Sequence, residues 1–324
     1  MKHGIDNVIY SALKSNEDPI NILYMGYDGI FDTILSTTPN TNFFIYKPKA
    51  LCRFWGAPLS NKFTYIDNFY NIPNRIDLDV IICNDRKEQI FVAEKMSHHL
   101  HIPIVVVEHN LPSSKSKPSL RQYINSRMPN SRCVIPHKTI KDEWYMSDDV
   151  DIIPYGIPIQ KRIIKHKNVV VVNNFQDSNS DVLNKLLTIS VDTIGVGYNG
   201  GRTQEYKHFG ELIEFIRSAV VCITLVDEDG PPFIPLLAMG CGTVVLTNKT
   251  RWTTQIITEG ENGFLFDGLK DARKKCKSIL GDKDLVEDVI YNAYQYISNN
   301  HEREKFCDRW TNLIKSVIRK PYIR

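Results

Sequence analysis

The sequence predicts an α/β protein made of two doubly wound domains in tandem. Short apolar runs rich in Val and Ile recur in two series along the chain, with amphipathic helical patterns between them. Such β-α alternation is typical of parallel sheets that are covered by helices. The chain has 324 residues, enough for two domains of roughly 150 residues each. A hydrophobic share of 42% and a charged share of 24% indicate a globular chain rather than a disordered one.

The first series of strands fills the N-terminal half. Its apolar runs, such as IVVV, suit strands that are buried on both faces. The expected strands are residues 20–25, 43–46, 79–83, 104–107 and 132–135, with a helix over 86–100.

Two strand ends in this half carry candidate site residues. The first strand runs into a turn with Gly26 and Gly29, where the backbone can approach a phosphate or a sugar, although an ordinary tight turn needs the same residues. The strand over 104–107 ends in Glu108, His109 and Asn110. Ligands bind outside the carboxyl ends of strands in open α/β sheets, so all five are candidates. A histidine that merely caps its strand is the alternative for His109.

The second series begins after residue 160, with strands expected at 169–172, 193–196, 219–225 and 243–247 and helices at 181–189 and 205–217. The strand over 219–225 leads into Asp227, Glu228 and Asp229, whose carboxylates can meet the hydroxyls of a sugar or a ribose. Pro231 and Pro232 then fit the first turn of a helix, because that turn needs no N–H. The amides at the start of this helix would face a diphosphate.

The stretch DGPPFIPLLAMGCGTVVLTN, followed by IITEGENGFLF, resembles the donor segment of retaining GT-B glycosyltransferases of group 1. That family writes the segment as an acid, G-F-G-x-P-x-x-E-A-M-A-x-G-x-P-V-V and then N-G-x-L. The resemblance implies the GT-B fold, in which two Rossmann-like domains face a cleft and a C-terminal helix crosses back to the N-terminal domain. It also implies transfer of a sugar from a nucleotide-sugar donor to an acceptor hydroxyl, with retention, without a metal ion and without a further cofactor.

The resemblance also divides the chain. DIIPYGIP at 151–158 is similar to the family's short strand, turn and crossover. We therefore expect an acceptor-side domain over 1–160 and a donor domain over 161–300. Apolar residues at helical spacing predict a helix in 301–324 that packs one face on the N-terminal domain. They are Phe306, Trp310, Leu313, Ile314 and Val317.

The family's donor residues can be carried onto this chain position by position. Its two acids stand eight positions apart, and the first, which contacts donor-sugar hydroxyls, falls on Asp229. The second, which contacts the ribose, falls on Leu237, which has no carboxylate. Gly230, Phe233 and Ile234 take the positions of the donor turn between them.

The N-terminal candidates also acquire roles from the resemblance. It places His109 close to the reacting centre, so Asp229 and His109 are the predicted catalytic residues. Glu108 and Asn110 are then predicted to bind the acceptor, and Gly26 and Gly29 to approach the donor.

The positive charge for a diphosphate is harder to locate. Relatives place an arginine and a lysine after the first strand of the C-terminal domain, where this chain has Asn173 and Asn174. Asn173 and Arg202 are therefore predicted donor-binding residues, with Lys207 and Arg251 as further substitutes. Each of these cations could equally be a surface residue.

Two patterns in the sequence resemble metal-binding motifs, and each has a simpler explanation. The triplet 227–229 matches the D-x-D metal signature of the other major glycosyltransferase fold, but two β-α series flank it, which favours GT-B. His98, His99 and His101 end a helical pattern, where cations on a solvated face complement the helix dipole. The sequence therefore predicts no metal site.

The acceptor is left open. A glycan, a lipid-linked sugar, a protein, a small molecule and a hydroxymethylated base in phage DNA all fit the fold. A DNA acceptor would use a basic surface, for which residues 115–127 offer a candidate patch, although solvated loop charges explain these residues better. Because Leu237 and Asn173 depart from the family, a catalytically degenerate GT-B domain that binds a sugar or a partner is the alternative function. The patch consists of Lys115, Lys117, Arg121 and Arg127.

The expected location is the cytoplasm, or the host cytoplasm if the source is viral. No apolar run approaches the ~20 residues that span a bilayer, and the N-terminus lacks the apolar core of a signal peptide. The seven cysteines stand singly, which predicts neither a disulfide framework nor a zinc site.

Overall fold

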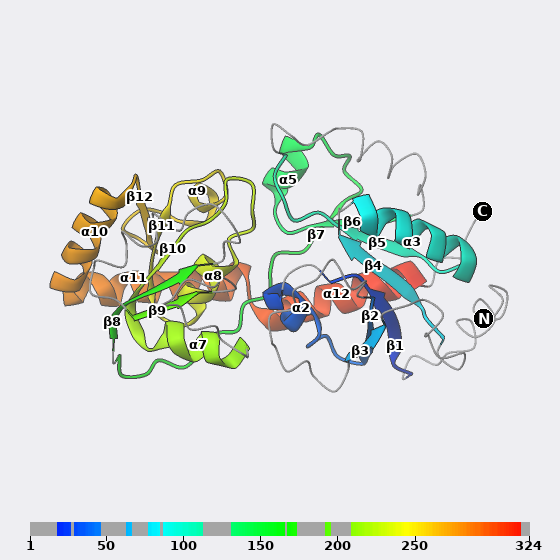
Figure 1. Cartoon of the computed structure of the whole chain (residues 1–324), viewed down its shortest axis with the longest axis horizontal. Helices are drawn as coiled ribbons and strands as arrows, with labels where there is room; N and C mark the ends of the chain where they lie inside the picture. The colour runs from blue at the N-terminus through cyan, green and yellow to red at the C-terminus, as the bar shows by residue number, and fades with distance from the viewer. Residues whose placement is uncertain are drawn as a thin grey trace. The chain divides into compact units, whose positions relative to one another are not determined.

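The chain divides into two compact units. The computed structural model describes residues 18–26, 29–46, 63–66, 77–84, 87–112, 131–165, 167–173, 192–195 and 209–318. Among these, residues 18–155 and 304–318 form the N-terminal unit, and residues 156–303 form the C-terminal unit (Figure 1).

The N-terminal unit is built on a parallel sheet with the strand order β3-β2-β1-β4-β5-β6-β7. The order reverses between β1 and β4, which is where an open α/β sheet opens a crevice. The five strands predicted in this half are confirmed, and β3 was missed because its four residues, FTYI, lack an extended apolar run. The strands are β1 (Ile20–Tyr24), β2 (Thr41–Tyr46), β3 (Phe63–Ile66), β4 (Val80–Asn84), β5 (Ile104–Val107), β6 (Arg132–Ile135) and β7 (Asp151–Ile152).

Helices cover this sheet. Ile90, Ala93 and Met96 of α3 (Lys87–Leu100) join a buried cluster with strand residues such as Ile81 and Val106. The other described helices of the unit are α2 (Gly29–Leu35), α5 (Lys138–Glu143) and α12 (Arg303–Ile318).

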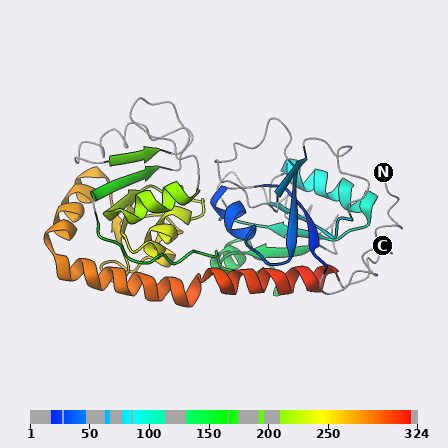
Figure 2. The same ribbon diagram turned by 90° about the horizontal axis from the view of Figure 1, so that it is seen from below.

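The last helix packs into the N-terminal unit. Phe31 of α2 makes edge contacts with Phe306 and Trp310 of α12, at ring-centroid distances of 6.1 and 6.3 Å. Figure 2 shows α12 (red) running beside the strands of this unit. The helical spacing seen in the sequence is confirmed, since the apolar residues that it selected are all buried on α12.

The C-terminal unit is built on a second parallel sheet with the order β12-β11-β10-β8-β9. Its order reverses between β8 and β10. The four predicted strands are confirmed as β8 (Lys167–Asn173), β9 (Asp192–Gly195), β10 (Ala219–Thr224) and β11 (Val244–Asn248), and β12 (Phe264–Phe266) is added. The predicted helix at 181–189 and residues 205–208 lie outside the described residues.

Five helices of the C-terminal unit are described. Val289 and Ile290 of α11 and Ala272 of α10 share a buried cluster with Val221 and Ile223 of β10. The sequence did not predict α10, because its apolar stripe is narrow within the charged run LKDARKKCKSILG. The helices are α7 (Phe209–Arg217), α8 (Phe233–Gly240), α9 (Thr253–Ile256), α10 (Leu269–Gly281) and α11 (Lys283–Asn300).

The helix after the acidic loop differs slightly from the prediction. Pro231 and Pro232 precede α8 instead of forming its first turn, because Pro232, with ψ 50°, lies at the N-cap. All eight residues of α8 are buried. The helix ends at Gly240, where a Cβ would lie 2.7 Å from Ile157 Cγ2, so a glycine is required for this close approach. Gly242 follows with φ +64°, which reverses the chain into β11.

Lys165 is half-buried at the amino end of this sheet. Its Nζ donates hydrogen bonds to the carbonyl oxygen of Arg217 at 2.8 Å and to Thr243 Oγ1 at 3.2 Å. Burial lowers the pKa of the Lys165 ammonium to about 8, because desolvation disfavours the charged form.

None of the helices in the described part of the chain combines the length and the apolar character that crossing a bilayer requires.

We expect Trp310→Ala to destabilise the chain by about 3 to 5 kcal/mol, since it removes a side chain that is 1% exposed between α12 and α2. Urea unfolding followed by far-UV circular dichroism measures this loss. Arg309→Ala changes the exposed neighbour on the same helix and should stay within about 0.5 kcal/mol. Equal losses in the two variants would show that α12 is not anchored by this contact.

Lys165→Met should change the pH dependence of stability. The folded-state pKa of Lys165 lies below its unfolded value, so the unfolded chain binds the proton more tightly and the contribution of this group to stability rises with pH above about 8. The stability of the variant relative to the parent chain should therefore be greatest near pH 7 and should fall towards pH ~10. Urea unfolding under reducing conditions tests this, with the exposed Lys277→Met as control. Parallel pH profiles for the two variants would refute the linkage.

Candidate donor site

The candidate donor site lies at the carboxyl edge of the C-terminal sheet. β10 pairs in parallel with both β8 and β11, and Thr224 at its end is in register with Val172 and Thr247. The loops after β10 and β11 therefore leave the sheet at the same edge. This edge includes the reversal of strand order between β8 and β10, the usual ligand position in such sheets.

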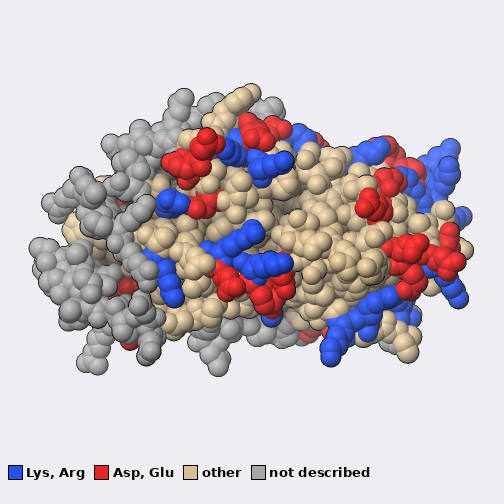
Figure 3. Space-filling view, turned by 180° about the vertical axis from the view of Figure 1, so that it is seen from behind, with Lys and Arg blue, Asp and Glu red and all other residues tan. Residues whose placement is uncertain are grey.

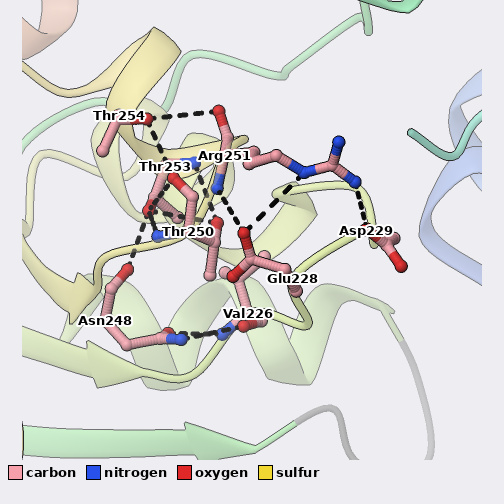
Figure 4. A network of polar contacts seen from close by, with 8 residues as sticks. All are labelled: Val226, Glu228, Asp229, Asn248, Thr250, Arg251, Thr253 and Thr254. Atoms are coloured by element: carbon pink, nitrogen blue, oxygen red, sulfur yellow. Dashed lines mark hydrogen bonds and ion pairs between the residues drawn. The ribbon is translucent and has the colours of Figure 1, made fainter. Parts of the chain in front are cut away.

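Asn248 connects these two loops through hydrogen bonds. Its Oδ1 accepts a hydrogen bond from the amide of Val226 at 2.7 Å, and its Nδ2 donates one to the carbonyl oxygen of Val226 at 2.9 Å (Figure 4). An asparagine can make both bonds because its amide holds one acceptor and one donor. The start of the acidic loop is therefore fixed to the end of β11.

A threonine network shapes the turn after β11. Thr253 Oγ1 accepts from the amide of Thr250 at 2.8 Å and donates to the carbonyl oxygen of Asn248 at 2.7 Å. Thr254 Oγ1 donates to the carbonyl oxygen of Thr250 at 2.9 Å. These bonds hold the turn that carries Arg251.

Arg251 contacts the acidic loop from this turn. Its Nη2 forms an ion pair with Asp229 Oδ1, its amide donates to Glu228 Oε1 at 3.3 Å, and its Nε lies 3.8 Å from that same oxygen (Figure 4). The Arg251 and Asp229 side chains are 35% and 31% exposed. A pair exposed to this degree contributes only about 0 to 1 kcal/mol to stability. Its value is therefore in placing charges, not in holding the fold.

Asp227 is the acid that Arg251 does not bind. Among the described residues its carboxylate has no hydrogen-bond or ion-pair partner, and its carbonyl oxygen accepts from the Gly230 amide at 3.1 Å. Partial burial, and then the negative charge of Asp229, raise the pKa of Asp227. The loop therefore presents one open carboxylate and one paired carboxylate.

The other predicted donor residues fall into two groups. Phe233, Ile234 and Leu237 lie in α8 and are 1%, 2% and 0% exposed, so they shape the helix beneath the loop. Asn173 ends β8, two strands from β11 at the same edge, while Arg202 lies outside the described residues. The substitute Lys207 and the basic patch at 115–127 also lie outside them.

His109 lies in a buried hydrogen-bond network of the N-terminal unit. Its imidazole is 1% exposed, with Nε2 3.0 Å from Asn84 Oδ1 and Nδ1 3.2 Å from the Tyr155 hydroxyl. Asn84 Nδ2 donates to the carbonyl oxygen of Met25, which leaves Asn84 Oδ1 as an acceptor. Nε2 of His109 therefore carries a proton and donates to Asn84 Oδ1, while Nδ1 shares a hydrogen bond with the Tyr155 hydroxyl. In this arrangement the histidine joins the ends of β1, β4 and β5.

The other candidate site residues of the N-terminal unit lie near His109, at the carboxyl ends of the same strands. Glu108 is 2% exposed and its Oε1 accepts from the Asn110 amide at 2.8 Å, while the Asn110 carbonyl oxygen accepts from Trp144 Nε1 at 3.0 Å. The Gly26 carbonyl oxygen accepts from Gln89 Nε2 at 3.0 Å, and Gly29 begins α2. The structure thus brings these candidates to the carboxyl edge of the N-terminal sheet.

Sequence reasoning missed Asn248 and gave Arg251 a minor place. A polar residue at the end of an apolar strand was the available signal for Asn248, but its partner Val226 lies 22 residues away in sequence. The described residues contain no group of three or more His, Cys, Asp and Glu that could hold a metal ion, and independence from metal remains a prediction.

Comparison with known proteins extends this description. Residues 199–296, which include the acidic loop and the turn with Arg251, match the family described as Glycosyl transferases group 1. A sequence search of curated proteins gives no match.

Solved structures share the fold at low sequence identity. A glycosyltransferase from Rickettsia africae is 13% identical, with a TM-score of 0.66 over 93% of this chain and 99% of its own. Anabaena Alr3699/HepE, solved with UDP-glucose, is 12% identical, with a TM-score of 0.70 over 92% of this chain and 100% of its own. Sucrose-phosphate synthase from Thermosynechococcus elongatus is 12% identical, with a TM-score of 0.66 over 92% and 99%. The chain therefore has the GT-B fold of these glycosyltransferases, with two Rossmann-like units, and residues 199–296 of its C-terminal unit match the group 1 glycosyl transferase model.

Proposed function

We propose that the protein is a glycosyltransferase that uses a nucleotide-sugar donor, transfers the sugar with retention of configuration and needs no metal ion. The observation that carries the proposal is the acidic loop at the reversal of strand order, fixed by Asn248 and contacted by Arg251, inside the matched group 1 segment. Uridine diphosphate sugars are the first donors to test, because Alr3699/HepE was solved with UDP-glucose.

The described residues suggest how the reaction is supported. Asp229 would accept hydrogen bonds from donor-sugar hydroxyls, and the fixed loop would place the reacting carbon without rearrangement. In a retaining transfer of this kind, the leaving diphosphate helps to remove the proton of the acceptor hydroxyl on the face where it attacks. His109 is then a positioning residue, since both ring nitrogens are bonded within the N-terminal unit.

The acceptor class stays a proposal among a glycan, a lipid-linked sugar, a small molecule and a modified DNA base. Basic and acidic side chains are intermixed on the face that Figure 3 displays. A DNA-binding surface is instead expected to gather Lys and Arg. Acceptor trials should include both sugar acceptors and DNA, because the predicted basic patch at 115–127 lies outside the described residues.

A thermal-shift screen of the protein against nucleoside diphosphates and nucleotide sugars, with and without magnesium, tests the donor proposal. A ligand bound by the folded state raises the melting temperature. We expect a shift with one nucleotide class that does not need magnesium, and proton NMR of the product should show the donor's anomeric configuration. No shift across the panel would favour the degenerate, partner-binding alternative.

Asp229→Ala should lower turnover of the nucleotide sugar by at least about tenfold, because the sugar hydroxyls lose a charged acceptor. Circular dichroism should show an intact fold, since the Asp229 side chain is partly exposed. Asp288→Ala on α11 removes an exposed acid outside the site and serves as control. Parent-like turnover in Asp229→Ala would defeat the assignment.

Asn248→Asp tests the fixed loop. The aspartate can still accept from the Val226 amide but cannot donate to the Val226 carbonyl oxygen, so the acidic loop should lose its fixed position. We expect a fall in kcat larger than the change in KM, together with a stability loss of about 1 to 3 kcal/mol. Asn248→Ala should give a similar fall in kcat. If kcat stays unchanged in both variants, the bonds to Val226 do not matter for catalysis.

A further inference from the structure

We propose that Arg251 binds the diphosphate of the donor, and that Asp229 holds the guanidinium until the donor arrives. The inference rests on the proposed use of a nucleotide sugar. It gives the paired carboxylate two successive partners: Arg251 in the free enzyme and the donor sugar in the complex.

The negative charge of the acidic loop at this edge of the sheet means that a diphosphate needs a cation to bind there. Asp227, Glu228 and Asp229 bring three carboxylates to one loop, and among the described residues Arg251 is the guanidinium that contacts two of them, Glu228 and Asp229. Asn173, which ends the neighbouring strand β8, is uncharged. A diphosphate that approached this loop would meet an excess of negative charge, unless a cation turned towards it. Arginine suits this task, because its planar fork of N–H groups matches phosphate oxygens.

The ion pair is built so that this exchange is easy. The backbone at Arg251 is held by its amide bond to Glu228 and by the threonine turn, so the side chain can rotate while the loop stays in place. The guanidinium and the Asp229 carboxylate are both about one third exposed, so water screens their attraction. Phosphate oxygens accept charge-assisted hydrogen bonds of the same kind as a carboxylate does. A bound diphosphate would therefore replace Asp229 as the partner of the guanidinium.

The other cation on this turn has a different partner. Lys249 pairs with Asp267 beyond β12, and the two side chains are 48% and 66% exposed. Its ion pair therefore leads to the residue after β12 and not to the acidic loop. Among the described residues, Arg251 is the cation that the ion pairs connect to residues 227–229.

Two carboxylates on the same loop give a matched test. Asp229→Asn and Asp227→Asn remove the same charge, but only Asp229 pairs with Arg251. Calorimetric titration with uridine diphosphate, uridine monophosphate and uridine should show that Arg251→Gln weakens diphosphate binding by at least about tenfold and leaves uridine binding unchanged. Asp229→Asn should bind uridine diphosphate about two- to fivefold more tightly than Asp227→Asn, because it releases the guanidinium. Arg251→Lys, which keeps the charge but loses the fork, should lie between Arg251→Gln and the parent.

The outcomes separate this inference from the proposed function. If the parent chain binds uridine diphosphate and Arg251→Gln binds it equally well, the role of Arg251 is refuted while the donor proposal stands. Equal diphosphate affinities of Asp229→Asn and Asp227→Asn would refute the exchange. If the parent chain binds none of a panel of nucleoside diphosphates, the proposed function fails and this inference fails with it. Melting temperatures within a few degrees of the parent's would show that each variant is folded.

Discussion

Parallel pairing of β10 between β8 and β11 is the constraint on which the candidate site depends. These strands are apolar, as is typical of parallel sheets that are covered on both faces, and because they run in one direction the loops that follow them leave at one edge. Residues far apart in sequence then become neighbours there. Asp229 and Arg251 are 22 residues apart in the chain, yet their side chains form an ion pair.

The site differs from a flexible acidic loop in one physical respect. Asn248 forms hydrogen bonds with both backbone groups of Val226, which would otherwise bind water. Because the loop is already ordered in this way, it loses little further conformational entropy when a ligand binds. Dipoles and charges that are already in position stabilise a developing charge better than groups that must first reorient. Asn248 thus fixes the backbone of the acidic loop, whereas in the proposed exchange the Arg251 side chain is the part that moves.

The sequence predicted the sheets well and the side-chain partners poorly. All nine predicted strands are present because buried parallel strands require apolar runs, which are visible locally. The α10 helix was missed because its buried residues, such as Cys276, are thinly spaced among lysines. The partners of His109 lie 25 and 46 residues away, and only the strand order brings them together. Candidate positions at strand ends could therefore be predicted, but not which of them face one another.

The fully buried α8 helix also bears on how this chain can change. The resemblance places Leu237 at the position of the family's ribose-binding acid, and the structure shows it 0% exposed in a helix whose other residues are buried as well. Restoring a carboxylate there would bring a charge into surroundings that no longer offer it a partner on its own helix, at a cost of several kcal/mol. A single Leu237→Glu substitution is therefore expected to destabilise the chain rather than to add a ribose contact. A carboxylate for the ribose would be tolerated better on the loops at the sheet edge, where side chains are partly exposed.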